Sequence, residues 1–474
     1  MRPRQLRFPL SGWIDPAAAF GALYATSTDV MWLDSGVAAT TGLSHMGTAA
    51  RTVSTDDITG SIFDHLEAEL PSDPAAAPGN GFALGWVGWL GYELRFETLG
   101  IERTTRSRYP DAAFAWLDRA IEFDHATSTV SLIAWGTEWV GDLAHWRDTT
   151  AAALAAVGLA AGLAPRIAPR TIDPRSLAAA GSSRGGAGAA GGSWRYGEAE
   201  YRGMIADCQT AITEGEAYQL CLTTEFSIDG AFDPYDVYVA LRGSSPTHHG
   251  ALLRIGGVSV LSASPEVFLS VSPNGVVESR PIKGTRPRGS TPARDAELRD
   301  ELLHSEKERA ENLMIVDLMR NDLGRFAELG SVQVTNLLAV ESYAHVHQLV
   351  STVEARLAAG LTGVDAVAAC FPAGSMTGAP KISAMTILDA FEGGPRGLYA
   401  GAFGYFGRNG AVDLAMVIRS IVLDPDGASI GTGGGITALS DPLEEIEETR
   451  LKAAALLAVL GMHPAGSATG QSQV

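Results

Sequence analysis

The sequence predicts an α+β fold. Many short segments alternate apolar and polar residues as strands do, and helical patterns lie between them without strict strand–helix alternation. The 474 residues are 46% hydrophobic and 19% charged, which is enough to bury a large core and excludes disorder for most of the chain. We therefore expect a large folded α+β protein.

The predicted elements of the C-terminal part follow in chain order. Strands are expected over 218–228, 258–261, 266–271, 276–282, 400–406, 412–423 and 428–433. A helix is expected to end over 206–214, a long one to cover 293–326, and a last one to cover 441–460. Asn274-Gly275 favours a two-residue hairpin turn, and Asp441-Pro442 is typical of a helix start.

Composition divides the chain. Residues 1–157 are rich in Trp and short apolar runs, whereas 158–197 are crowded with Ala and Gly and predict a linker. Residues 198–463 hold nearly all the polar motifs, and 464–474 are expected to be a disordered tail. We expect an N-terminal region followed by a catalytic domain.

Charge and cysteine content limit the possible functions. There are 35 Lys and Arg against 54 Asp and Glu, and the net charge of −19 argues against nucleic acid or an anionic membrane as partner. An anionic substrate would need local Arg, Lys, backbone N–H groups or a metal ion. Cys208, Cys221 and Cys370 form no disulfide or metal pattern. With no signal sequence or membrane-length apolar run, the sequence predicts a cytoplasmic protein.

The predicted hairpin brings two reactive side chains together. In a two-residue turn at Asn274-Gly275, facing residues have numbers that sum to 549, and Glu266 with Lys283 is such a pair. The pair is either a site or an ordinary cross-strand ion pair, and Pro281 can break the register.

Two acidic pairs occur at helical spacing. Glu308 with Glu311, and Glu445 with Glu448, each place two carboxylates on one helix face. If the two helix faces converge, their four negative charges would repel one another unless a cation lies between them. Mg²⁺ suits this place because it binds oxygen donors. The alternative is that both are solvated helix faces.

The glycine-rich stretches are not nucleotide loops. Residues 374–381 lack the GxxxxGK[ST] pattern, and 431–435 lack the GxGxxG spacing. Consecutive glycines after a strand either expose N–H groups that hold a carboxylate or make a tight turn.

Five motifs together resemble the chorismate-utilising enzyme family. They are RPIKGTRPRG (280–289), KERAENLMIVDLMRNDL (307–323), FPAGSMTGAPK (371–381), GTGGGI (431–436) and DPLEEIEETRLK (441–452). WLDSG (32–36) and GWVGWLGYEL (85–94) resemble the N-terminal segments of its aminating members. The resemblance implies a two-subdomain α+β fold of packed antiparallel sheets with outer helices.

The resemblance also implies roles for single residues. Glu311 and Glu448 match direct Mg²⁺ ligands, with Glu308 and Glu445 reaching the metal through water. Glu266 matches the acid that protonates the departing C4 hydroxyl of chorismate, and His347 a histidine near that group. The positions that match substrate contacts are Gln219, Thr285, Thr377, Tyr399, Arg419, Gly433, Gly435 and Lys452.

Two positions separate the branches of the family. In the family members that add water to chorismate, a lysine base stands at the position where this chain has Gln219. Glutamine cannot deprotonate water, so the resemblance disfavours that branch. Anthranilate synthases typically read PIAGT where this chain has Lys283, which resembles the lysine that attacks C2 of chorismate in aminodeoxychorismate synthase component I. The resemblance thus implies Mg²⁺-dependent amination of chorismate to 4-amino-4-deoxychorismate, toward 4-aminobenzoate and folate.

The sequence also bears on the source of ammonia and on two alternative functions. None of the three cysteines lies in a glutaminase-like elbow, so a separate glutamine amidotransferase subunit is expected to supply ammonia. Alternatives are an anthranilate synthase component I and a catalytically silent partner of an amidotransferase. Asp34 and Ser35 match a segment that binds regulatory tryptophan in anthranilate synthases, and are either a regulatory site or a structural remnant.

Overall fold

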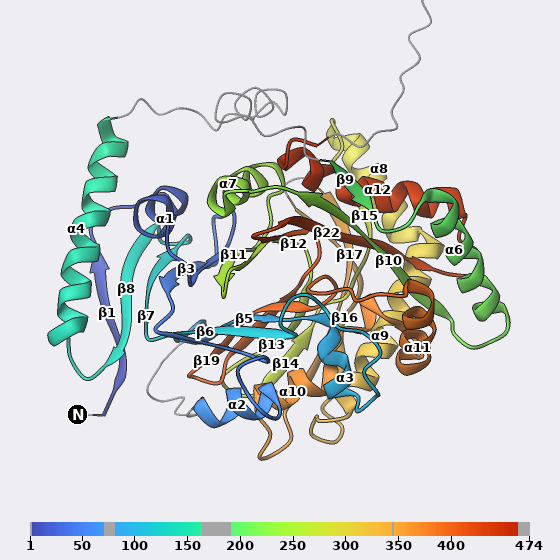
Figure 1. Ribbon diagram of the computed structural model, residues 1–474, viewed down its shortest axis with the longest axis horizontal. Helices are drawn as coiled ribbons and strands as arrows, with labels where there is room; N and C mark the ends of the chain where they lie inside the picture. Colours follow the sequence, from blue (N-terminus) through green and yellow to red (C-terminus); the bar gives the residue numbers. More distant parts are fainter. Residues whose placement is uncertain (1, 71–80, 164–190, 344–345, 463–474) are drawn as a thin grey trace, which may run out of the picture.

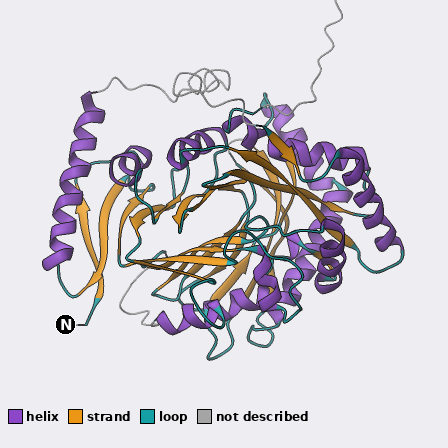
Figure 2. Cartoon of the chain, in the orientation of Figure 1, coloured by secondary structure: helices purple, strands orange, loops and turns teal. Residues whose placement is uncertain are grey.

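Two antiparallel sheets pack face to face, and helices cover their outer faces (Figures 1 and 2). The computed structural model describes residues 2–70, 81–163, 191–343 and 346–462. The predicted α+β fold of packed antiparallel sheets is confirmed. No helix within these described ranges is long and apolar enough to cross a membrane.

The first sheet has twelve strands among the described residues. In spatial order they are β1 (Arg4–Leu10), β8 (Thr129–Gly136), β7 (Arg119–Asp124), β3 (Leu43–Thr48), β2 (Val30–Asp34), β11 (His249–Ile255), β12 (Val258–Ser264), β21 (Ser420–Asp424), β22 (Gly427–Ile436), β10 (Gln219–Asp229) and β18 (Gly378–Ala379), with β9 (Gly192–Trp194) also paired to β10.

The second sheet has ten strands in the same ranges. In order they are β15 (Ile282–Pro287), β17 (Val346–Arg356), β14 (Val276–Ser279), β13 (Val267–Val271), β20 (Val412–Met416), β19 (Ala402–Gly407), β5 (Gly85–Leu90), β6 (Ala112–Leu117) and β4 (Arg51–Ser54), with β16 (Gln333–Ser342) also paired to β17.

The helices join these strands. They are α1 (Pro16–Tyr24), α2 (Ile62–Glu69), η2 (Tyr92–Leu94), α3 (Arg95–Thr98), α4 (Gly141–Leu163), α6 (Glu198–Thr213), α7 (Pro234–Ser244), α8 (Pro292–His304), α9 (Glu306–Gly324), α10 (Gly363–Cys370), η3 (Gly374–Met376), α11 (Lys381–Glu392) and α12 (Pro442–Val459).

Both sheets combine strands from the two ends of the chain. Strand β2 pairs with β11, where Trp32 faces Leu252, and β5 pairs with β19, where Gly88 faces Gly404. A Cβ atom at Gly88 would lie 2.0 Å from the carbonyl oxygen of Ala113, so only glycine fits there. Residues 1–157 and 198–463 therefore share both sheets.

Regular elements occupy both ends of the predicted linker 158–197. Helix α4 continues to Leu163, and β9 pairs with β10 through Trp194 and Phe226. The rest of that linker, 164–190, and the predicted tail, 464–474, lie outside the described residues.

The hairpin register differs from the prediction. Val271 faces Val277 and Ser270 faces Glu278, so facing numbers sum to 548 and not 549. Ser272 closes a longer turn by bonding Val276, and Gly275 takes a φ of 77° within it. The predicted cross-strand pairing of Glu266 with Lys283 is therefore wrong.

Other predicted elements are divided in two. The pattern over 276–282 stops at Ser279, because β14 ends before Pro281 and β15 pairs with β17. The helix expected over 293–326 is two helices separated at Ser305, whose hydroxyl accepts from the N–H of Glu308.

The segment expected as one strand over 412–423 is two strands of different sheets. Strand β20 belongs to the second sheet and β21 to the first, and Arg419 between them has a φ of 50°. Apolar residues continue on both sides of this crossing, over 414–418 and 421–423, so the sequence pattern does not reveal it.

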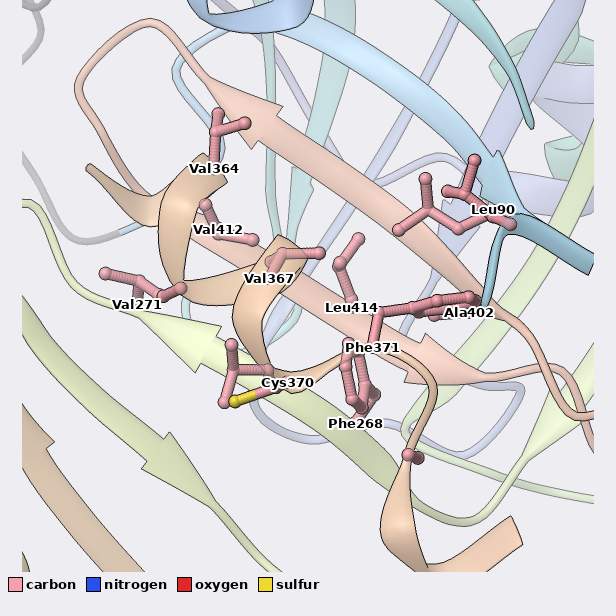
Figure 3. Close-up of a cluster of buried hydrophobic side chains, with 14 of the residues drawn as sticks. Leu90, Phe268, Val271, Val364, Val367, Cys370, Phe371, Ala402, Val412 and Leu414 are labelled. Atoms are coloured by element: carbon pink, nitrogen blue, oxygen red, sulfur yellow. The ribbon is translucent and has the colours of Figure 1, made fainter. Parts of the chain in front are cut away.

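A buried apolar cluster fixes α10 against the second sheet (Figure 3). Val367 and Phe371 pack on Val412 and Leu414, and Phe371 meets Phe268 edge to face at 5.9 Å. Each such side chain contributes about 1.5–3 kcal/mol by leaving water. This packing anchors the start of segment 371–381, which carries a predicted site motif.

Candidate active site

The chain passes between the sheets at two neighbouring places. Glu266 follows β12 and precedes β13, while Arg419 lies between β20 and β21. The N–H of Met416 donates to the Glu266 carbonyl at 3.0 Å, and the N–H of Ala263 donates to the Arg419 carbonyl at 3.1 Å. These bonds hold the predicted acid and the predicted carboxylate-binding arginine on adjacent crossings.

The surroundings of Glu266 suit a proton donor. Burial raises the pKa of its carboxyl, and the Lys283 ammonium and a hydrogen bond with Ser375 lower it less strongly. The net effect is a raised pKa, which favours the protonated acid. Ser375 lies in the motif 371–381, but sequence reasoning did not single it out.

Lys283 lies where several carboxyl groups meet. Burial raises the pKa of both Glu266 and Glu311, and the Lys283 ammonium lowers both. The next residue, Gly284, has a φ of 81°, and a Cβ there would lie 2.9 Å from the Glu308 carboxyl. The irregular start of β15 thus brings Lys283 to Glu266 without the predicted register.

The two acidic pairs converge from α9 and α12. Burial raises the pKa of Glu311, and the charges of Glu308 and Glu445 raise it further. Burial also raises the pKa of Glu445, with Glu448 adding to the effect. Like charges on two helices therefore face one space.

Cations already neutralise some of this acidic charge. Glu448 pairs with Lys452 at 2.8 Å, and its pKa is lowered because Lys452, Lys307 and Lys283 together outweigh its burial. Glu308 is 3.4 Å from Arg286.

The four carboxylates supply the oxygen donors that Mg²⁺ prefers, but their side chains are not close enough together to hold the ion. In the described ranges, no three His, Cys, Asp or Glu side chains are close enough to hold a metal ion. The donors are all oxygen, they repel one another, and Mg²⁺ keeps several waters between itself and such ligands. These observations support Glu308, Glu311, Glu445 and Glu448 as the residues that would hold it.

Strands β10 and β22 bring Gln219 to the glycine-rich segment. A Cβ at Gly435 would lie 2.0 Å from Gln219 Nε2, so the Gln219 amide occupies the space beside this glycine. Lys452 Nζ donates to the Gly433 carbonyl at 2.8 Å. Gln219 Oε1 is buried with no hydrogen-bond partner among the described residues, which leaves an acceptor at this place.

Arg419 and Tyr399 share the same region. Burial lowers the pKa of the Arg419 guanidinium, and Tyr399 and Glu448 raise it. The Tyr399 ring lies on Gly431, where a Cβ would be 2.1 Å from the ring. An arginine with such neighbours is suited to a carboxylate.

Two predicted contacts differ in accessibility. Thr377 is fully buried, and its hydroxyl lies 3.2 Å from the Gly374 carbonyl. Thr285 is exposed on β15 opposite Gln348.

His347 is buried on β17, and both of its ring nitrogens have partners. Its Nδ1 is 2.7 Å from the Ser342 hydroxyl and its Nε2 is 3.0 Å from Asp295. Arg288 and the N–H of Gly289 also bind Asp295. Its predicted role beside the leaving group stays a prediction.

Asp34 and Ser35 lie in a separate place. They line a cavity of about 510 Å³ between the sheets. Asp34 is buried and accepts from Arg242 at 2.5 Å and from Tyr238 at 3.2 Å, and the Ser35 hydroxyl donates to Leu43. These bonds give both residues a structural role, and a regulatory role stays a prediction.

Sequence reasoning missed a buried network behind the site. Arg396 donates to Glu392, to the Met376 carbonyl at 2.7 Å and to the Cys221 carbonyl at 2.8 Å. The Thr223 N–H donates to Glu392 at 2.9 Å. Thr377 is connected to this network, because its carbonyl accepts from the Cys221 N–H at 2.9 Å. Nothing in the local pattern around Arg396 indicates it.

The packed sheets, the convergent carboxylates and the adjacent lysine form a candidate acid–base site. A family model described as chorismate binding enzyme matches residues 28–458. The chain therefore belongs to the family of chorismate-binding enzymes.

Individual relatives and a solved structure agree with this family. Aminodeoxychorismate synthases from Streptomyces pristinaespiralis and Streptomyces griseus are 42% and 44% identical over 97% of this chain. The chain spans 66% and 65% of those two proteins. The crystal structure of anthranilate synthase component I from Streptococcus pneumoniae matches 95% of this chain and 99% of its own, with a TM-score of 0.72 and 27% identity.

Proposed function

We propose that this chain is the chorismate-aminating component I of an aminodeoxychorismate synthase. It would convert chorismate and ammonia to 4-amino-4-deoxychorismate. The observation that carries the proposal is the position of Lys283 beside Glu266 and Glu311. The names of the two Streptomyces relatives support the same product.

The first step uses Glu266 and Lys283. A neutral Lys283 amine adds to C2 of chorismate, and Glu266 gives its proton to the hydroxyl that leaves C4 as water. Burial raises the pKa of Glu266, which favours the protonated form that can give this proton. Lys283 passes its own proton to a neighbouring carboxylate before it attacks.

The second step releases the enzyme. Ammonia adds at C4 and Lys283 departs from C2, so every bond formed at one carbon is balanced by one broken at the other. Gln219 Oε1 has no hydrogen-bond partner in the part of the chain that the structure describes, and it offers an acceptor for an ammonia N–H. We propose that Arg419 and the N–H groups beside Gly433 and Gly435 hold the substrate carboxylates.

A magnesium ion held by Glu308, Glu311, Glu445 and Glu448 would supply positive charge for a substrate carboxylate. We also propose that the ammonia comes from a separate glutamine amidotransferase subunit. In the described ranges the three cysteines are buried, and burial raises the pKa of each thiol, which disfavours a glutaminase nucleophile here.

One assay separates the products. The chain is incubated with chorismate, Mg²⁺ and ammonium, with and without aminodeoxychorismate lyase. Formation of 4-aminobenzoate only with lyase supports the proposal, whereas direct formation of fluorescent anthranilate would identify an anthranilate synthase.

A variant tests the covalent step. The variant Lys283→Ala should lose amination of chorismate. Lys307 is a nearby lysine with the same charge, and the control variant Lys307→Ala should keep this activity. Full activity of Lys283→Ala contradicts the covalent role.

A further inference from the structure

A second cavity lies on the far side of the first sheet from the candidate active site. It has a volume of about 280 Å³ and is lined by residues of β9, the start of α6, β10 and α12. Successive residues of β10 face opposite ways: Thr223 bonds Glu392 in the network behind the active site, and Thr224 lines this cavity. The sheet therefore separates the two places.

The cavity has aromatic walls that their neighbours hold in place. Tyr196 stacks nearly parallel to Tyr201 at 6.4 Å, with 11° between the rings. Trp194 meets Phe226 edge to face at 5.1 Å. Such fixed ring faces favour a flat apolar ligand over a flexible one.

Its polar groups favour a negative charge. Helix α6 begins here after Gly197, and no side chain of the described residues caps its first N–H groups. Thr224 is only 6% exposed, and its hydroxyl has no hydrogen-bond partner among the described residues. A buried hydroxyl without a partner costs stability, and a ligand oxygen would remove that cost.

The charged residues at the rim are compatible with an anion. Glu198 would repel one, but Arg450 pairs with it at 2.8 Å. The side chains of Arg450 and Glu198 are 40% and 51% exposed, so Arg450 is free to turn toward a second carboxylate.

We propose that this cavity binds a small aromatic carboxylic acid, with its ring between the aromatic walls and its carboxylate at the start of α6. A volume of about 280 Å³ is close to the lower end for ligand sites and suits a single ring. The proposal holds whichever amino product the active site makes.

Occupancy of this cavity would reach the active site through α12. Ile446 and Thr449 line the cavity, whereas Glu445 and Glu448 on the same helix face the candidate metal site. Thr449 lies one turn along the helix from Glu445, so a ligand against Thr449 would contact the part of α12 that carries this carboxylate.

Binding is tested by calorimetric titration of the full chain with 4-aminobenzoate and benzoate. Aniline, which lacks the carboxylate, and acetate, which lacks the ring, are the comparison ligands. We expect saturable binding of the two aromatic acids and at least tenfold weaker binding of aniline and acetate.

Variants locate the site. Thr224→Val should weaken benzoate about 3- to 10-fold, the usual effect of one lost hydrogen bond. Arg450→Gln is on the surface, keeps the fold and should also weaken it severalfold. Thr210→Val is the matched control, since Thr210 is exposed on the same helix α6 and its hydroxyl bonds only Ala206 within the described residues.

Three results would overturn the proposal. They are absence of saturable binding, unchanged affinity in both Thr224→Val and Arg450→Gln, and loss of binding in Arg419→Gln, which would place the acid in the candidate active site.

Discussion

Glu311 on α9 and Glu445 on α12 are close enough for their negative charges to interact. Burial raises the pKa of Glu311, and Glu445 adds to the effect. A divalent cation between the helices would relieve this repulsion and stabilise the folded protein by mass action. We expect Mg²⁺ at 100 times its Kd to add about 2.7 kcal/mol, seen as a raised melting temperature.

Glu311→Gln and Glu445→Gln should each weaken this Mg²⁺ effect at least tenfold. Each should also raise the melting temperature of the metal-free protein, because a buried charge is removed. Glu447→Gln, one position from Glu448 and exposed, is the control. An unchanged Mg²⁺ titration in both variants contradicts the ligand assignment.

Glu266→Gln should reduce kcat by about 10²- to 10⁴-fold, the usual contribution of a positioned acid. Because the acid must be protonated, wild-type activity should fall as the pH rises through the raised pKa of Glu266. Steady-state kinetics across pH checks this. Glu278→Gln is the control, since burial also raises its pKa but it lies within the paired strand β14. Retention of full activity by Glu266→Gln would exclude it as the acid.

The N-terminal strands should confer acid sensitivity through Glu122. Burial raises the pKa of Glu122, but His45 and Arg7 outweigh burial and lower it from 4.5 to about 2. A depressed pKa stabilises the fold above pH 4.5 and ceases to do so as the pH falls toward 2.

Glu122→Gln should therefore cost about 2–3 kcal/mol in unfolding free energy at pH 7 and progressively less below pH 4.5. Urea denaturation at pH 7 and pH 3.5 measures the difference. Glu69→Gln removes a more exposed pair with Arg51 and should cost less than about 1 kcal/mol. A Glu122→Gln cost that is equal at both pH values would contradict the linkage.

Removal of Arg396 should leave Glu392 as an uncompensated buried charge. Arg396→Met is expected to lower the free energy of unfolding by about 3–5 kcal/mol. The double variant Arg396→Met with Glu392→Leu should recover part of the loss, because it removes both charges. If urea denaturation finds the two single losses additive, the pair is not coupled.

Much of the fold could be predicted because it depends on local patterns. Strand β10, strand β22 and helix α12 lie within a few residues of their predicted bounds. The Asp441 carboxylate accepts from the N–H groups of Leu443 and Glu444, as its place before Pro442 indicates.

The candidate site was harder to predict from local sequence patterns than the fold. The approach of Glu266 to Lys283 was predicted, but by a register that does not form, since the strands diverge after Ser279 and β15 joins β17. The network of Arg396 joins segments from distant parts of the chain. No local sequence pattern distinguishes its members from other charged residues, because only the tertiary fold brings them into contact.

The mixed composition of the sheets has a consequence for synthesis on the ribosome. Strand β2 pairs with β11, and β5 pairs with β19. The N-terminal strands therefore leave the ribosome long before these partners are synthesised. Until then their unpaired edges and apolar faces are open to other chains. Both sheets can therefore be completed only after β19 and β22 have been synthesised, near the end of translation.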